Sequence, residues 1–187
     1  MYFQMTVCAV GCFALEELWV FVNSLCGNEN SSLTVRFFGL FGCFCFLLAS
    51  NAGTFDRFVD EHSGGDAKKA KLCGFIAPVL LTVGFFAIPG RTVGELIVEA
   101  VVFVPAVVSS YFNLKHILLP PDEAGLLRAT RATDILALVF YAINCVSFIP
   151  ALFASEYIGI IRVLMASVMA TVAVLSERGA KKWETLV

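Results

Sequence analysis

Apolar residues fill six long stretches of the chain, separated by short segments that are rich in Gly, Pro, Asn and charged residues. Each stretch has roughly the 17–25 residues with which an α-helix crosses the hydrocarbon core of a bilayer. Lipid offers no partners for backbone N–H and C=O groups, so helices are expected here rather than open strands. The pattern predicts membrane-spanning helices over Met5–Cys26, Leu33–Ser50, Leu72–Ile88, Thr92–Phe112, Thr133–Phe153 and Tyr157–Ser176.

Turn-forming residues mark the boundaries between these stretches. The segments Asn51-Ala52-Gly53 and Pro89-Gly90-Arg91 end the second and third predicted spans. Pro120 and Pro121 stand before acidic residues, an order that is typical of a helix start, and this helix is expected to continue into the fifth span. The connection at 154–156 is very short, so a re-entrant hairpin is an alternative to two full spans there.

Composition places the chain in the membrane. Of its 187 residues, 59% are hydrophobic and only 15% are charged, whereas soluble domains carry about 25% charged residues. This balance excludes a soluble domain and a disordered chain, and it provides no basic face for nucleic acid. The predicted fold is therefore an all-α membrane protein, a six-transmembrane-helix bundle that forms a single polytopic domain over 1–187.

The distribution of basic residues predicts an orientation. An even number of spans puts both termini on one side, together with the loops 51–71 and 113–132 and the tail 177–187. Ten of the thirteen Lys and Arg residues then fall on that side, which the preference of positive charge for the cytoplasmic side makes the inner one. They are Arg57, Lys68, Lys69, Lys71, Lys115, Arg128, Arg131, Arg178, Lys181 and Lys182. Both termini are therefore expected on the cytoplasmic-equivalent side.

Targeting signals and chemical motifs are not evident in the sequence. The first span lacks a basic segment before it, which argues against a signal peptide or transit peptide and leaves the membrane unspecified. The seven Cys residues lie mostly inside spans and are interpreted as small apolar residues. Because no nucleophile, metal or nucleotide motif is found, no catalytic, cofactor-binding or metal-binding residue is predicted. An enzyme is disfavoured, and bound lipid is the only expected ligand.

Small residues and prolines inside the spans predict close packing and bends. Gly39 and Gly42 lie one turn apart in the second span, and Ala166 and Ala170 form a small-xxx-small pair in the sixth. These four residues are candidates for helix packing. Three prolines, at positions 78, 105 and 150, are expected to kink their helices.

Six ionisable residues at membrane depth are the most informative positions in the chain. A charge in hydrocarbon costs about 2.5–3.5 kcal/mol at the centre of a helix, so such residues must face protein, water or one another. Pairs such as Glu99 with Arg162, or Glu95 with Arg36, would lower that cost. Two interpretations stay open: a structural ion-pair lock, or a path for protons, cations or a substrate. The candidates are Glu16, Glu17, Arg36, Glu95, Glu99 and Arg162.

These features favour a non-enzymatic integral membrane subunit with a structural or accessory role, packed in a larger multi-subunit membrane assembly. Its expected partners are membrane lipids and other membrane subunits or copies of itself, but not nucleic acid. The alternative is a small-solute or ion transporter or channel that uses the intramembrane Glu and Arg residues. A membrane enzyme acting on lipid or quinone is less favoured, since such an enzyme should show a nucleophile, base or metal constellation.

Overall fold

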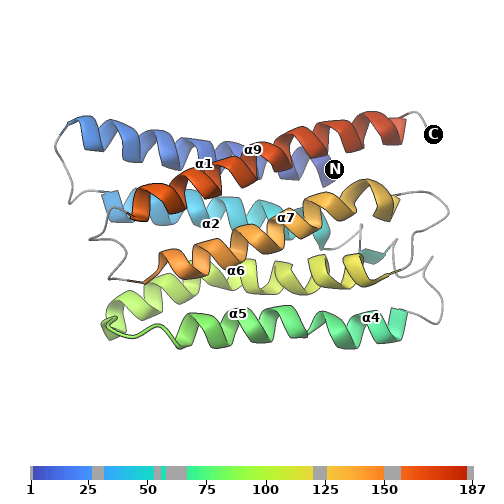
Figure 1. The fold of residues 1–187 in the computed structure, drawn as a ribbon, viewed down its shortest axis with the longest axis horizontal. Helices are drawn as coiled ribbons and strands as arrows, with labels where there is room; N and C mark the ends of the chain where they lie inside the picture. The colour runs from blue at the N-terminus through green and yellow to red at the C-terminus, as the bar shows by residue number, and fades with distance from the viewer. Residues whose placement is uncertain are drawn as a thin grey trace.

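The computed structural model describes residues 2–26, 32–52, 56–57, 67–119, 126–149 and 157–184. Within these ranges the regular elements are all helices, which run back and forth along one common direction (Figure 1). They are α1 (Tyr2–Leu25), α2 (Ser32–Asn51), α4 (Ala67–Gly74), α5 (Ile76–Phe86), α6 (Val93–Leu118), α7 (Leu126–Ser147) and α9 (Tyr157–Glu184).

Five of these helices close into a ring. α1 packs on α2, α2 on α6, α6 on α7, α7 on α9, and α9 returns to α1. α4 and α5 lie outside the ring, where α4 contacts α6 and α5 contacts both α6 and α7 (Figure 1). The side chains that point into the ring are therefore shielded from lipid by protein on every side.

Aromatic side chains fill the centre of the ring. Phe44 of α2 makes edge-to-face contacts with Phe103 of α6 and Phe140 of α7, each with ring centroids 6.0 Å apart. Phe13 of α1 meets Phe140 at 5.3 Å, and Phe85 of α5 stacks on Phe103 at 5.4 Å. Such pairs stabilise by about 0.5–1.5 kcal/mol beyond the burial of their area. The buried polar groups lie on either side of this aromatic layer, toward the two ends of the bundle.

The length and composition of the helices are those of a multi-pass membrane protein. Five described stretches are long and apolar enough to cross a membrane, and a shorter apolar helix covers Phe37–Asn51 within α2. The first and last helices bring both chain termini to one end of the bundle (Figure 1), which is called the termini end below. That this end faces the cytoplasmic-equivalent side stays a prediction.

The third predicted span is divided into two helices. α4 ends at Gly74 and α5 begins at Ile76, so the predicted segment Leu72–Ile88 contains a break at Phe75. Pro78 explains this break, because proline has no N–H to donate to the carbonyl of Gly74 four residues earlier, yet it is tolerated in the first turn of α5. α4 and α5 together still form one apolar stretch, Lys68–Phe86.

The boundaries of α6 and α7 also differ from those expected. α6 continues past Phe112 to Leu118, and α7 begins at Leu126, so the predicted loop 113–132 is mostly helical in the described residues. Pro120 sets the end of α6, because the residue before a proline avoids the helical conformation, and Leu119 is extended. In the same way α7 ends at Ser147, before Pro150, rather than continuing to Phe153. Pro150 itself lies outside the described residues.

Candidate functional site

A buried polar network occupies the interior of the ring between the aromatic layer and the termini end. One face of α6 supplies Ser109, Asn113 and His116, whose spacing of four and three residues aligns them on one side of the helix. The Tyr141 hydroxyl of α7 donates a hydrogen bond to Ser109 at 2.9 Å. The Asn51 side chain, at the end of α2, donates to the Asn113 amide oxygen.

Asp134 of α7 is the only carboxylate that the described residues place in this network, and it is 1% exposed. The Tyr2 hydroxyl donates to its Oδ1 over 3.4 Å. Asn51 and Thr130 lie beside the carboxylate, but within the described ranges Oδ2 accepts no hydrogen bond. A buried polar atom without a partner costs free energy, so Oδ2 is a costly atom of the site. The name polar network is used below for Tyr2, Asn51, Ser109, Asn113, Asp134 and Tyr141.

A second acidic group, Asp56, lies near the end of α6 and holds two basic side chains. Lys115 donates from Nζ to Asp56 Oδ1 at 2.6 Å, and His116 Nε2 lies 3.1 Å from the same oxygen. Partial burial works to raise the pKa of Asp56, but the hydrogen bonds from His116 and Lys115 outweigh it and lower this pKa below its usual value. Sequence analysis counted Lys115 among the loop cations, whereas its side chain is only 1% exposed.

At the opposite end of the bundle, Arg91 and Glu99 form a buried ion pair with a distance of 3.0 Å between Nη1 and Oε2. Arg91 also donates to the carbonyl oxygen of Phe85, and its guanidinium lies 4.3 Å from the centroid of that ring. One partner of Glu99 is therefore Arg91, a residue that was predicted to lie in a loop. This pair ties the start of α6 to the end of α5.

Glu95 does not share this arrangement. It is exposed and forms a capping box at the start of α6, in which its Oε2 accepts from the backbone N–H and the hydroxyl of Thr92, each at 2.8 Å. In return the Thr92 hydroxyl accepts from the backbone N–H of Glu95. Although Glu95 and Glu99 lie on one helix face, one caps the helix and the other closes an ion pair.

The remaining predicted charges are spread over three helices. Glu16 of α1 is 2% exposed and packs against α2, while Glu17 is partly exposed. Arg162, in the second turn of α9, is half-buried, and its Nε has no hydrogen-bond partner among the residues described. Arg36 lies in α2, but its side chain is outside the described part of the chain. The described side chains among these candidates thus lie on α1, α6 and α9.

The two predicted pairs of small residues lie in different surroundings. Gly39 and Gly42 face α1: a Cβ on Gly39 would lie 2.6 Å from Cβ of Glu16, and one on Gly42 would lie 3.1 Å from Sγ of Cys12. Ala166 and Ala170 are exposed on the outer face of α9. The first pair packs against another helix of the same chain. The second pair is not covered by any described helix.

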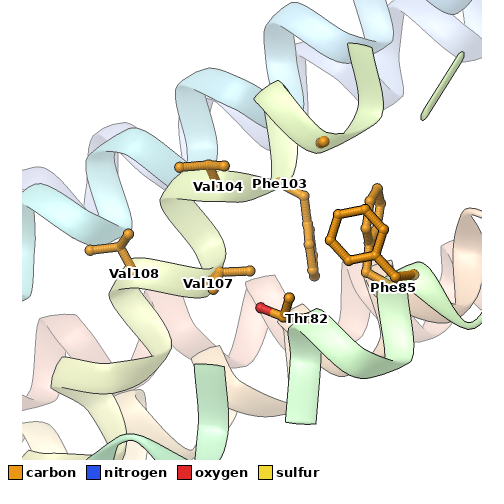
Figure 2. Close-up of a pocket in the computed structure, with 8 residues that line it drawn as sticks. Thr82, Phe85, Phe103, Val104, Val107 and Val108 are labelled. Atoms are coloured by element: carbon orange, nitrogen blue, oxygen red, sulfur yellow. The ribbon is translucent and has the colours of Figure 1, made fainter. Parts of the chain in front are cut away.

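A groove lies between α5 and α6 (Figure 2). It has a volume of about 130 Å³, and Phe85, Phe103, Val104, Val107 and Val108 are among the residues that line it. Thr82 supplies its one hydroxyl group. The lining offers apolar contact but no charged group that would orient a substrate.

Sequence analysis missed the polar network and the role of Arg91. A signal for the network exists, because Ser109, Asn113 and His116 recur at helical spacing in an otherwise apolar helix. Their partners Tyr2 and Asn51 lie at the ends of other helices and carry no local signal. All seven cysteines are free, and the described residues contain no group of three or more His, Cys, Asp or Glu that could hold a metal ion.

Comparison of the chain with protein-family models, with curated proteins and with solved structures gives no match. Functional conclusions therefore depend on the residues and their geometry.

Proposed function

We propose that the protein is a non-enzymatic subunit of a larger membrane assembly, and that the outer face of α9 is the surface that contacts its neighbour. The observation that carries this proposal is a stripe of exposed Gly, Ala and Val residues along α9, in which Gly159, Ala166 and Ala170 are the small ones. It consists of Gly159, Val163, Ala166, Ala170 and Val174, which is called the α9 stripe below. Their spacing places them on one face of the helix.

Small residues on an outer face favour a helix as neighbour over lipid. In a membrane, small side chains allow two backbones to approach closely and pack by van der Waals contact. A Cβ added to Gly159 would meet no atom of the described chain within 4 Å, so this face is open. The outer face of α5 is different, because it presents large residues such as Ile76, Leu80 and Phe86. α5 thus has the surface expected against acyl chains, and α9 has the surface expected against a helix.

Arg162 borders the α9 stripe and supports the same proposal. It precedes Val163 by one residue, and its Nε is buried without a hydrogen-bond acceptor in the described ranges. An arginine at membrane depth is costly unless it is paired. A neighbouring helix that offers a carboxylate or free carbonyl oxygens beside the stripe would supply the missing acceptor.

The proposal is tested by measuring native mass after extraction in mild detergent. We expect a particle heavier than a monomer or small homo-oligomer, because other subunits remain bound. The double substitution Ala166→Leu with Ala170→Leu should release them, since the added side chains keep the two helices apart. Ala142→Leu, on an exposed position of α7, is the matched control and should leave the particle intact. A wild-type protein that is a bare monomer or small homo-oligomer contradicts the proposal.

Transport of a small solute or ion is a second candidate, which the polar network favours. Polar groups occupy the interior at both ends of the bundle, with Asp134 on one side of the aromatic layer and Glu99 on the other. Buried carboxylates at membrane depth are frequent in ion paths. Purified protein in liposomes should then support proton or cation flux that Asp134→Asn reduces, whereas equal flux in the variant argues against this role.

A further inference from the structure

Among the buried oxygen atoms that have no hydrogen-bond partner within the described residues, three belong to side chains that lie beside Asp134 or Tyr2. They are Oδ2 of Asp134, Oδ1 of Asn51 and Oγ1 of Thr133. Their side chains are each 1–2% exposed, so bulk water does not reach them. Buried polar groups are nearly always paired in folded proteins, and exceptions call for an unplaced partner.

Asp134 and Thr133 lie beside the Tyr2 hydroxyl, and Asn51 lies beside Asp134. Tyr2 donates to Oδ1 of Asp134. Side chains from α1, α2 and α7 therefore bring one carboxylate and several neutral oxygens to the same place inside the ring.

Asp134 forms no direct ion pair with a cation of the described residues. Arg131 is the nearest cation that acts on it, but the guanidinium of Arg131 donates to the carbonyl oxygen of Leu119 at 2.6 Å. The other titratable groups that face the carboxylate are Tyr2 and Tyr141, which are neutral in their ordinary state. A single positive charge would balance the carboxylate when it is ionised.

We propose that Asp134, Asn51, Thr133 and Tyr2 form a binding site for one monovalent alkali cation. Oxygen ligands suit hard cations, and one carboxylate balances one positive charge. The described residues hold no second acidic group in the site and no cluster of His, Cys, Asp and Glu, so a divalent or transition metal ion is disfavoured. The site goes beyond the proposed role in an assembly and does not depend on it.

A cation accounts for the geometry better than a proton does. A proton on Oδ2 of Asp134 would pair that atom with one of the other two oxygens and leave the third without a partner. A cation is shared by all of them at once, because each lone pair can point to the same centre. The Tyr2 hydroxyl can donate to Oδ1 and still present its own oxygen to the ion.

The test is the thermal stability of the purified protein in detergent at constant ionic strength, with Na⁺ or K⁺ exchanged against choline. Binding to the folded state should raise the melting temperature in a saturable way, by about 3–6 °C at ten times the dissociation constant. A saturable rise in the melting temperature of the wild-type protein with Na⁺ or with K⁺ supports the site. Equal melting temperatures in Na⁺, K⁺ and choline overturn it, whatever the variants do. A melting temperature that depends on pH but not on alkali ions also overturns it and indicates a proton.

Variants locate the effect. Asp134→Asn should abolish the alkali-dependent shift and still fold in choline, because a neutral amide needs no counter-ion. Asn51→Ala should weaken binding on the order of tenfold, as expected for the loss of one ligand. Asn144→Ala is the matched control, since Asn144 is equally buried in α7 but lies about 15 Å further along the helix. A shift that survives Asp134→Asn, or that Asn144→Ala removes, contradicts the assignment.

Discussion

Substitution of Gly39 by alanine is expected to push α1 and α2 apart. The added Cβ would lie 2.6 Å from Cβ of Glu16 and 3.3 Å from the backbone oxygen of Cys12. Neither atom is the end of a flexible side chain, so rotation of a side chain cannot relieve the clash. The two helices must separate by about 1 Å before the carbon atoms reach ordinary contact near 3.5–4.0 Å.

The cost of this separation can be isolated with a second glycine. Overpacking of a well-packed interface costs about 1–3 kcal/mol, whereas glycine to alanine inside a helix gains about 0.5–1 kcal/mol. Gly11 lies in α1, and a Cβ there would meet nothing within 4 Å, so Gly11→Ala has the gain without the clash. The difference between the unfolding free energies of the two variants cancels the gain from alanine in a helix. It leaves the overpacking cost of about 1–3 kcal/mol.

The assay is thermal or denaturant unfolding of both variants in the same detergent, followed by circular dichroism. For a chain of this length 1 kcal/mol corresponds to about 2–4 °C. Gly39→Ala should therefore melt about 2–12 °C below Gly11→Ala. If Gly39→Ala melts at or above the temperature of Gly11→Ala, the close contact between α1 and α2 is not as described, and the packing argument is refuted.

Two further predictions concern ion pairs at opposite ends of the bundle. Arg91→Ala leaves Glu99 as a buried charge without its cation and should destabilise the protein by about 3–5 kcal/mol in denaturant unfolding; an effect below 1 kcal/mol would mean that the pair is solvated. Asp56 has a lower pKa when folded than when unfolded, because the hydrogen bonds from His116 and Lys115 outweigh the opposing effect of burial. Its stabilisation is present above about pH 4 and is lost as the pH falls below that value. Wild type and Asp56→Asn should thus differ in stability at pH 7 and converge in acid, and a difference that grows in acid would contradict the sign.

The sequence predicted the elements of the fold well because their signal is local. Long apolar stretches can only be helices in a membrane, and the described helices α1 and α2 match the predicted spans closely. Some of the boundaries that differ lie at prolines, whereas α9 continues past its predicted end at Ser176 to Glu184 without one. At Pro78 and Pro120 the backbone chemistry of one residue divided or ended a helix, even where the apolar composition continued.

The candidate site was harder to predict from the sequence than the helices were. The spacing of Ser109, Asn113 and His116 could have indicated a polar face on α6, but not which residues would meet it. Tyr2 and Asn51 reach the site only because α1 begins and α2 ends at the same level of the bundle. The residues that Tyr2 and Asn51 contact are far from them in the sequence, so no short segment of the chain contains the whole polar network.

By itself, the sequence determined that the chain is a helical membrane protein and which residues are costly to bury there. Both properties follow from the free energy of each residue in lipid, which depends on its own chemistry and its immediate neighbours. Only the tertiary structure decided that Glu99 pairs with Arg91 and that Asp134 sits among neutral oxygens. Such partners depend on how each helix is rotated and shifted against the next, and a rotation of one residue, about 100°, moves a side chain from the interior to the lipid.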